Sequence, residues 1–303
     1  MIMIDRIATD LCLEPDYIAS IVTRSAFYYR DYYIRKRDGN QRRIAQPSPE
    51  LKTLQYWTVN NILKKLPVSD SAFAYQKGSS IKKHADFHKN SKFILHTDVF
   101  HFFSSITYAH LRPILLRNPD IFKELKIDLT GIDVISGICF RNNQLCIGAV
   151  SSPIISNIIM YGFDLKISEY CAKNHLLYSR YADDIYLSSN SFIDQTHLEY
   201  LTEALRELGF QINKSKTFFS SPKNCRRVTG LVIGTDATVT IGSEKRAFIK
   251  KLVYQKLVHH IGDGESILGF LAFLKDVEPE TYNRIIIKYS RYCKEDIIKE
   301  LKE

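Results

Sequence analysis

Two short apolar and aromatic runs around a pair of adjacent aspartates constrain the fold of this 303-residue chain most strongly. The runs lie at residues 177–182 and 185–188, with Asp183 and Asp184 between them. Runs rich in Tyr, Ile and Leu on either side of a polar break predict a β-hairpin. Two unpaired carboxylates about 4 Å apart at its tip would repel each other by about 4 kcal/mol at an effective dielectric constant of about 20. A divalent cation removes that repulsion, whereas the alternative interpretation is a polar turn, in which Asp is common.

A third carboxylate ends a buried strand pattern earlier in the chain. Residues 93–99 read Phe-Ile-Leu-His-Thr-Asp-Val, so Asp98 closes an apolar run. Burying a lone carboxylate is costly unless it is paired or bound to a metal. The segment between Asp98 and Asp183 is long enough for the two strands to be neighbours in one sheet. Three carboxylates beside a basic surface would then form the donor set of a two-metal phosphoryl-transfer site.

Composition and charge point to the class of partner. The net charge is +9, from 42 Lys and Arg residues against 33 Asp and Glu residues. This excess favours a polyanion, nucleic acid first, and the alternative is a basic protein without such a partner. The 45% share of hydrophobic residues is typical of a folded globular protein. Scattered cysteines, no signal-peptide pattern and no long apolar run predict a cytoplasmic protein without a membrane partner.

A second hairpin is expected at residues 28–45, where Asp38-Gly39 separates two β-prone runs. A basic two-stranded finger of this kind fits contact with phosphates. The alternative is a solvated edge hairpin that is protected by its charge. Its cationic residues are Arg35, Lys36, Arg37, Arg42 and Arg43.

The other segments alternate between helical and extended patterns. Ser48-Pro49 predicts a helix start, and residues 108–140 read as helices. Gly148 begins a run of small residues that opens an apolar helix near Ser152. Small residues let a nucleotide or template backbone approach closely, although close packing of helix on sheet would also require them.

The C-terminal part begins with an amphipathic helix pattern at residues 191–209. Residues 210–218 alternate like a strand, and residues 226–233 predict another strand. From Ser243 onward the pattern is helical, with an apolar stripe and a basic face that suits a nucleic-acid backbone. The cations of that first helix are Lys245, Arg246, Lys250, Lys251 and Lys256.

Taken together, the motifs resemble those of a reverse transcriptase, and specifically a bacterial retron reverse transcriptase. The resemblance covers roughly residues 20–290, with the motifs in the family's order. The similar segments are residues 84–88 (the Asn-Ala-x-x-His element), 95–106 (first catalytic Asp), 148–157 (template and nucleotide positioning), 180–184 (Arg-Tyr-Ala-Asp-Asp), 213–217 (the lysine motif) and 228–230 (the retron Val-Thr-Gly tripeptide).

This resemblance implies an α+β right-hand polymerase fold of fingers, palm and thumb. The fingers would comprise residues 1–92, with the N-terminal helices and the basic hairpin. The palm, an antiparallel sheet with helices, would comprise residues 93–235, including a fingers-type helical insertion at about 107–144. The thumb, a helical RNA-binding region, would comprise residues 236–303.

The resemblance also implies the roles of individual residues. Asp98, Asp183 and Asp184 would be catalytic and, with the Val99 carbonyl, would bind two Mg²⁺ ions, for which Mn²⁺ could substitute. Phe103 would exclude a 2′-hydroxyl. The other nucleotide-binding residues would be Lys36, Arg42, Arg43, Gly148, Ala149 and Lys216. Nucleic acid would be bound by Lys77, His88, Ser152, Thr229, Gly230, Lys245, Arg246, Lys250 and Lys251.

Two positions depart from the family pattern. Many members read Leu-Pro-Gln-Gly where this chain has Leu145-Cys146-Ile147-Gly148, so Ile147 lacks the amide that would contact the nucleotide. His84 replaces the Asn of the Asn-Ala-x-x-His element. These departures bear on fidelity and RNA recognition rather than on the carboxylates.

The function implied by the resemblance is copying of a cognate structured noncoding RNA into single-stranded DNA, called msDNA. Deoxynucleoside triphosphates would be the substrates, an RNA 2′-hydroxyl the primer, and anti-phage defence with a separate effector protein the biological role. Two alternatives stay open. The protein could be a scaffold subunit whose RNA–DNA product holds a toxic effector inactive, or a reverse transcriptase of the group II or abortive-infection type.

Overall fold

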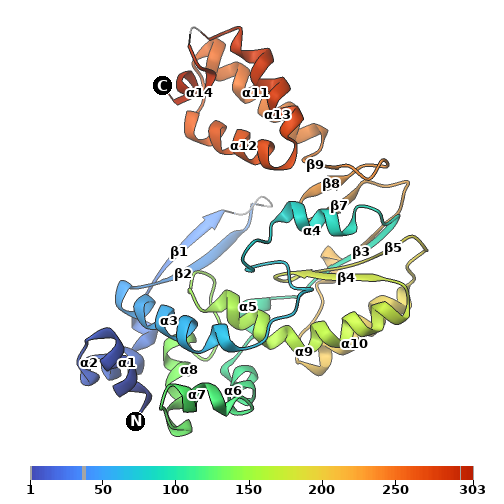
Figure 1. Ribbon diagram of the computed structural model, residues 1–303. Helices are drawn as coiled ribbons and strands as arrows, with labels where there is room; N and C mark the ends of the chain where they lie inside the picture. The colour runs from blue at the N-terminus through green and yellow to red at the C-terminus, as the bar shows by residue number, and fades with distance from the viewer. Residues whose placement is uncertain (1, 36–38, 294, 303) are drawn as a thin grey trace. The chain divides into compact units, whose positions relative to one another are not determined.

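The computed structural model describes residues 2–35, 39–293 and 295–302, so the predicted phosphate contact Lys36 lies outside the described residues (Figure 1). The chain forms two compact units. Unit 1 comprises Met1–Lys77, Thr97–Ile185 and Asp194–Thr217, and unit 2 comprises Gly78–His96, Tyr186–Ile193 and Phe218–Glu303. The fingers, palm and thumb boundaries stay a prediction.

The N-terminal part of unit 1 confirms the expected basic hairpin. Strands β1 (Tyr29–Arg35) and β2 (Gln41–Pro47) pair antiparallel, and Tyr33 lies opposite Arg43. Helix α3 (Pro49–Asn61) begins as predicted, because the Ser48 side chain accepts a hydrogen bond from the Leu51 N–H. The preceding helical elements are α1 (Met3–Leu11), α2 (Pro15–Thr23) and η1 (Ser25–Phe27), and η2 (Leu63–Lys65) follows α3.

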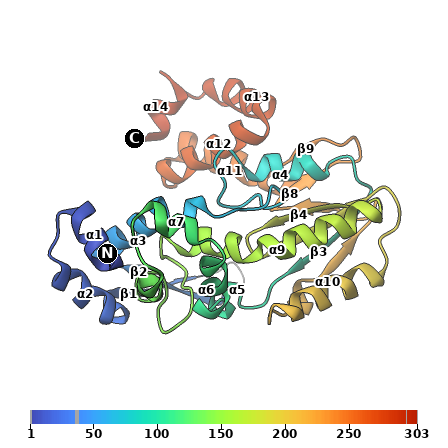
Figure 2. The same ribbon diagram turned by 60° about the horizontal axis from the view of Figure 1, so that its bottom comes forward.

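The rest of unit 1 is mainly helical. Helix α9 (Ser152–Lys173) is the apolar helix expected after the small-residue run, and α9 packs against both β4 (Leu177–Tyr181) and α10 (Gln195–Glu207), as Figure 2 shows. Asp194 caps α10 by accepting from the Thr196 N–H. The other helices are α5 (Phe102–Ser105), α6 (Tyr108–Leu116), α7 (Pro119–Glu124), η3 (Leu129–Asp133) and α8 (Val134–Cys139).

A four-stranded sheet has the strand order β4-β5-β3-β6, where β3 is Phe93–Asp98, β5 is Asp184–Ser189 and β6 is Phe218–Ser220. The predicted neighbourhood of the two carboxylate-bearing strands is therefore confirmed, since β5 lies beside β3. The predicted strand over residues 210–218 is wrong. Residues Lys214–Lys216 form a 3-10 turn, η4, because the Asn213 N–H donates to the Asp98 carbonyl at 2.7 Å and turns the chain toward β3.

Unit 2 contains helix α4 (Ile81–His88), which packs against strands β7 (Arg226–Val228) and β8 (Leu231–Ile233). The single strand expected over residues 226–233 is wrong, because Thr229 and Gly230 have φ of 46° and 79° and reverse the chain between β7 and β8. Positive φ at two consecutive residues is typical of a tight hairpin turn. The remaining elements are β9 (Val239–Thr240), α11 (Ser243–His259), α12 (Gly264–Val277), α13 (Pro279–Ser290) and α14 (Ile297–Lys302).

Buried aliphatic side chains from α11, α12, α13 and α14 form much of the core of unit 2, including Val253, Leu271 and Ile285. In the described part of the chain, every helix is too short or too polar to cross a lipid bilayer.

Candidate active site

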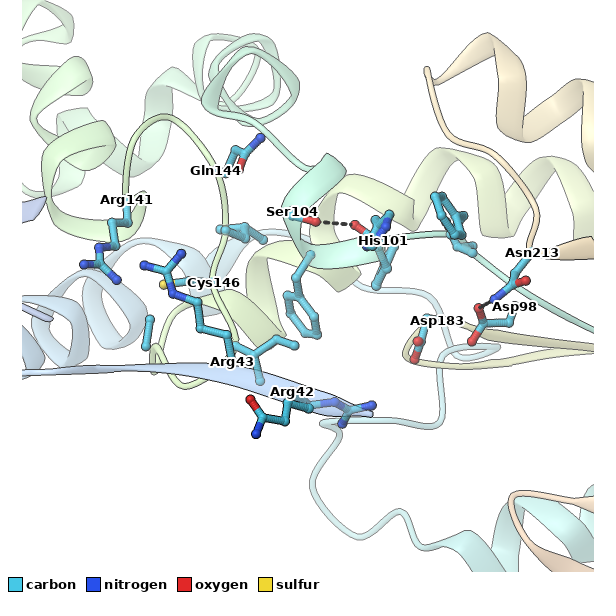
Figure 3. Close-up of a pocket in the computed structure, with 18 of the residues that line it drawn as sticks. Arg42, Arg43, Asp98, His101, Ser104, Arg141, Gln144, Cys146, Asp183 and Asn213 are labelled. Carbon is cyan, nitrogen blue, oxygen red and sulfur yellow. Dashed lines mark hydrogen bonds between the residues drawn. The ribbon is translucent and has the colours of Figure 1, made fainter. Parts of the chain in front are cut away.

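The turn between β4 and β5 carries the aspartate pair and is held in place by the end of β3. The Val99 N–H donates to the Asp183 carbonyl at 3.0 Å, so the chain that follows Asp98 is bonded directly to the turn. Asp98 and Asp183 both line a pocket of about 640 Å³, and Figure 3 shows their carboxylates at the same end of it. Asp184 is not among the described residues that line this pocket, although its charge acts on Asp183.

The segment after α10 wraps around Asp98. The Lys216 ammonium donates to Asp98 Oδ2 at 2.7 Å, and the Asn213 amide donates to Asp98 Oδ1 at 3.2 Å. Lys216 reaches Asp98 because residues 214–216 form the turn η4 instead of the predicted strand. Asn213 was not expected at the site, because an Asn before a strand-like alternation carries no signal for a contact so distant in sequence.

The pKa values of Asp183 and Lys216, at this end of the pocket, are shifted by burial and by the neighbouring carboxylates. Burial, Asp184 and Asp98 together raise the pKa of Asp183 to about 6. Burial lowers the pKa of Lys216, but its hydrogen bond to Asp98 and its attraction to the carboxylates outweigh burial, so the net shift is upward. Both shifts indicate a site that stabilises added positive charge.

Three arginines, Arg42, Arg43 and Arg141, line the same pocket, and Figure 3 shows Arg141 toward the end away from Asp98 and Asp183. Asp31 bridges two of them, accepting from Arg43 and from Arg141 at 2.7 Å each. These hydrogen bonds, the one from Arg43 first, hold the pKa of Asp31 well below its usual range. The predicted phosphate-binding roles of Arg42 and Arg43 stay predictions. Arg141, which starts a turn in the sequence, was not expected at the site.

An aromatic side chain and a departure from the family pattern also face this pocket. Phe103 lines it, and the Tyr75 ring lies 6.5 Å from the Phe103 ring between centroids. Ile147 lines it as well, at the position where Gln is frequent. Gly148 has φ of 114°, and a Cβ there would lie 2.7 Å from the Ala45 carbonyl oxygen. Close packing of this turn on β2 is therefore sufficient to require a glycine, and the approach of a nucleotide at Gly148 stays a prediction.

Comparison with known proteins decides the family. Residues 34–233 match the family described as "Reverse transcriptase (RNA-dependent DNA polymerase)". The chain belongs to the reverse transcriptase family. It is 32% identical to the Retron Ec83 reverse transcriptase of Escherichia coli, over 95% of this chain and 94% of that protein. It is 33% identical to the Retron Ec86 reverse transcriptase of Escherichia coli, over 94% of this chain and 87% of that protein.

A solved structure supports the fold of this reverse transcriptase. The apo telomerase of Candida tropicalis superposes with a TM-score of 0.52 and 13% sequence identity, over 90% of this chain and 61% of the telomerase chain. The predicted α+β polymerase fold is thereby confirmed. The relationship to retron enzymes also establishes the activity class, an RNA-directed DNA polymerase that acts on an RNA template and nucleotides.

Reverse transcriptases use divalent metal ions, and the donors in this enzyme fit such ions. Among the described residues, no group of three or more His, Cys, Asp or Glu side chains could by itself hold a metal ion. Mg²⁺ does not need one, because it is usually held by one or two carboxylates together with substrate phosphates and water. The carboxylates of Asp98 and Asp183 are hard oxygen donors in one pocket, and burial, with the charges of Asp184 and Asp98, raises the pKa of Asp183, so a bound cation would stabilise its ionised form.

Some of the residues predicted to contact nucleic acid are buried in this reverse transcriptase, and others are exposed. His88 is fully buried, and its Nδ1 lies 2.7 Å from the Ser188 hydroxyl. Burial, with a smaller effect of His84, lowers the pKa of His88 well below its usual value. Ser152 is also buried, at the start of α9. Neither side chain presents a surface to nucleic acid, so the expected direct contacts of His88 and Ser152 are corrected to roles in the interior.

The departure at His84 has a structural counterpart. His84 Nδ1 lies 3.0 Å from the Thr229 hydroxyl, and the Thr229 N–H donates to the Tyr186 hydroxyl at 3.1 Å. The two retron-type elements, on α4 and at the β7–β8 turn, are thus joined through side chains. Gly230, beside Thr229, is exposed.

The cations predicted on α11 differ in their surroundings. Lys250 and Lys251 are exposed, as is Lys77 in unit 1. Arg246 forms an ion pair with Glu278 at 3.2 Å, and the Lys245 ammonium lies 5.5 Å from the centre of the Phe273 ring. Their roles in nucleic-acid binding stay predictions.

Proposed function

We propose that this reverse transcriptase copies a structured noncoding RNA into a single-stranded DNA that remains attached to it. Priming from a 2′-hydroxyl of that RNA would leave a branched RNA–DNA product. The observation that carries the proposal is one pocket that is lined by two carboxylates, Asp98 and Asp183, and by three arginines. Its relationship to retron reverse transcriptases supports the retron type.

In the proposed reaction, Asp98, Asp183 and Asp184, with the Val99 carbonyl, hold two Mg²⁺ ions. Bound Mg²⁺ would supply activation of the attacking hydroxyl and neutralisation of charge on the leaving pyrophosphate. Lys216, whose ammonium donates to Asp98 Oδ2, gives a proton to the leaving group or neutralises its charge.

The other residues of the pocket orient the nucleotide. Arg42 and Arg43 bind the triphosphate, and Arg141 supports Arg43 through the shared carboxylate of Asp31. The Phe103 ring lies under the sugar and excludes a 2′-hydroxyl. Ile147 contributes apolar contact only, so its side chain gives no hydrogen bond to the base or sugar.

We also propose the partners beyond the nucleotide. The exposed cations Lys77, Lys250 and Lys251 contact the backbone of the RNA and of the RNA–DNA duplex. The product is proposed to act in anti-phage defence together with a separate effector protein. The fingers, palm and thumb boundaries given above remain part of this proposal.

Extraction of nucleic acid from the purified protein tests the retron assignment. We expect a branched RNA–DNA species that a debranching enzyme converts to linear RNA and DNA, whereas linear cDNA alone would contradict the proposal. Primer extension on an RNA template with Mg²⁺ tests the site itself. The Asp183→Asn plus Asp184→Asn variant should be inactive, and full activity of that variant would overturn the assignment of the carboxylates.

A further inference from the structure

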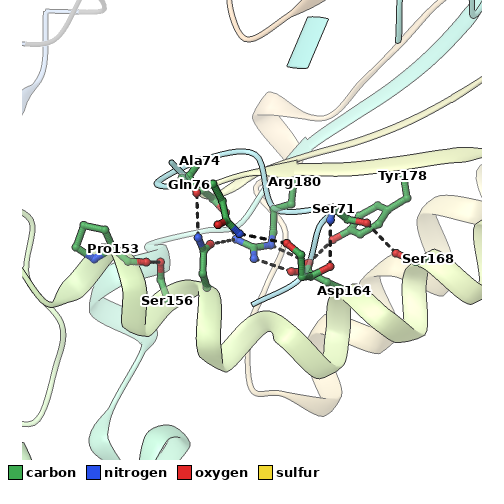
Figure 4. A network of polar contacts seen from close by, with 12 residues as sticks. Ser71, Ala74, Gln76, Pro153, Ser156, Asp164, Ser168, Tyr178 and Arg180 are labelled. Atoms are coloured by element: carbon green, nitrogen blue, oxygen red, sulfur yellow. Dashed lines mark hydrogen bonds and ion pairs between the residues drawn. The ribbon is translucent and has the colours of Figure 1, made fainter. Parts of the chain in front are cut away.

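A buried ion pair joins helix α9 to strand β4, directly behind the catalytic turn. Arg180 and Asp164 are both fully buried, and they form a two-pronged contact, from Nη2 to Oδ2 at 2.7 Å and from Nε to Oδ1 at 2.9 Å. The Tyr178 hydroxyl donates to the same carboxylate at 2.5 Å. The carboxylate is therefore well satisfied, and the guanidinium is held in one orientation (Figure 4).

The third guanidinium nitrogen of Arg180 reaches the catalytic turn itself. Arg180 Nη1 donates to the Ala182 carbonyl at 3.0 Å. Ala182 has φ of 59°, in the left-handed region, and directly precedes Asp183. A left-handed conformation is unfavourable for a residue with a Cβ. The contact with Arg180 is one of the interactions that keep this turn, and so the direction of the Asp183 carboxylate, in place.

The same nitrogen also reaches a second loop through Asn157 on α9. Arg180 Nη1 donates to Asn157 Oδ1 at 3.1 Å, and Asn157 Nδ2 donates to the Ala74 carbonyl at 2.9 Å. The main chain of Arg180 holds the same loop, because its N–H donates to the Ser71 carbonyl and its carbonyl accepts from the Phe73 N–H, each at 2.8 Å. Residues 71–74 are thus hydrogen-bonded to Arg180 on β4 and to Asn157 on α9.

The loop places Tyr75 at the active site. Tyr75 follows Ala74, has φ of 62°, and exposes about half of its surface. Its ring faces the Phe103 ring, which lines the pocket. Asp183 on the turn and Tyr75 on the loop are far apart in sequence, yet both are connected to one guanidinium.

We propose that Arg180 is a positioning residue whose guanidinium sets the catalytic turn and the Tyr75 loop in register, through Ala182 and Asn157 respectively, and that Tyr75 with Phe103 selects the sugar of the incoming nucleotide. The inference rests on the proposed catalytic role of Asp183. The contact of Arg180 with Ala182, here called the turn arm, governs the chemical step and the binding of Mg²⁺. The contact of Arg180 with Asn157, here called the loop arm, governs the affinity for the nucleotide and the preference for deoxyribose over ribose.

The variant Asn157→Asp isolates the loop arm. Its side chain keeps an oxygen acceptor for Arg180 but loses the amide that donates to the Ala74 carbonyl. We expect the KM for deoxynucleotides to rise about tenfold and discrimination against ribonucleotides to fall by a similar factor, with kcat within about threefold of wild type. Tyr75→Ala should have the same effects, and the double variant Asn157→Asp/Tyr75→Ala should be no worse than the more severe single variant.

The variant Arg180→Lys affects both arms, because an ammonium cannot reproduce the fixed fork of a guanidinium. We expect kcat to fall about 100-fold, the Mg²⁺ concentration for half-maximal activity to rise severalfold, and the KM for deoxynucleotides to rise. Arg206→Lys is the matched control, since Arg206 makes the same two-pronged contact with Glu203, at 2.9 and 2.7 Å, on the exposed face of α10. It should leave all three quantities unchanged.

A merely structural role for Arg180 and Asn157 has a different signature. Activity would then fall only in proportion to the folded fraction measured by thermal unfolding, with KM, Mg²⁺ dependence and sugar discrimination unchanged, and that result would overturn the proposal. Because Asn157→Asp preserves the Arg180–Asp164 pair, it gives a readout even where Arg180→Lys does not fold. Failure of the catalytic assignment is distinguishable, since Asp183→Asn would then remain active.

Discussion

Two ion pairs of unit 1 have the same separation and opposite surroundings. Arg180 and Asp164 lie 2.7 Å apart, and both side chains are 0% exposed. Lys216 and Asp98 also lie 2.7 Å apart, but the Lys216 side chain is 57% exposed against 5% for Asp98. The first pair is sealed from water and is fixed by a rigid fork. In the second pair, solvent reaches the ammonium of Lys216, whereas the carboxylate of Asp98 is buried.

The comparison shows why distance alone does not assign a role. A buried pair is strongly destabilising to break, because the remaining charge has no water to stabilise it. A half-exposed lysine pair contributes little to stability, since solvent screens it. The structure thus distinguishes a fully buried ion pair from one whose cation is half-exposed, and we propose different roles for the two. Variants of the two pairs should therefore differ in stability, activity and salt dependence.

The largest effect is expected from breaking the buried pair. Asp164→Ala leaves Arg180 charged and without its carboxylate, and should lower the free energy of unfolding by about 3–5 kcal/mol. Urea denaturation followed by circular dichroism measures this change. The control Glu203→Ala removes the exposed partner of Arg206 and should cost less than about 0.5 kcal/mol. Equal losses in the two variants would contradict the contrast between buried and exposed pairs.

The next effect concerns activity at the exposed pair. Lys216→Met keeps an unbranched side chain of nearly the same length but removes its charge and its proton. If Lys216 assists the leaving pyrophosphate, kcat should fall about 100-fold, while the free energy of unfolding changes by less than about 1 kcal/mol. Single-nucleotide incorporation and urea denaturation on the same preparation test both halves. Wild-type kcat would exclude the proposed role of Lys216.

A smaller effect should appear in the pH dependence of stability without divalent cations. The pKa of Asp183 is raised from 3.8 to about 6, so the folded chain binds this proton more tightly than the unfolded chain does. Its favourable contribution is complete below about pH 4 and is lost as the pH rises through about 6. Relative to Asp183→Asn, wild type should therefore lose about 2–3 kcal/mol of stability between about pH 4 and pH 7.

Paired unfolding curves for wild type and Asp183→Asn at several pH values provide the measurement. The stability difference between the two proteins should be constant above about pH 7, where Asp183 is ionised in both the folded and unfolded chains. A difference that does not vary with pH would show that Asp183 is less buried, and less crowded by other carboxylates, than the structure indicates.

The smallest effect is expected from salt. Raising the ionic strength screens the Lys216–Asp98 pair, so the small stability difference between wild type and Lys216→Met should shrink by a few tenths of a kcal/mol. The larger difference between wild type and Asp164→Ala should be far less sensitive, because its charges are buried. Thermal unfolding at low and high NaCl concentration compares the two. Equal salt sensitivity would indicate that water reaches Arg180.

Local patterns in the sequence were sufficient for the hairpins, the strand that ends at Asp98 and the helix that starts after Ser48. Each depends on neighbouring residues, such as alternation of apolar side chains, a capping serine or Asp-Gly in a turn. The same patterns predicted single strands over residues 210–218 and 226–233, and both predictions were wrong. There the chain turns at η4 and at Thr229-Gly230, because contacts with distant segments outweigh local preference.

The sequence by itself determined the family, the order of its motifs and the carboxylates that serve as candidates for metal binding. Only the tertiary structure decided that Asn213 and Lys216 bind Asp98, that Arg141 shares Asp31 with Arg43, and that His88 is buried. It also decided that Arg180 joins the catalytic turn to the Tyr75 loop. The physical reason is that the burial and partner of a charge depend on which distant segments pack around it, and residue spacing along the chain does not encode that packing.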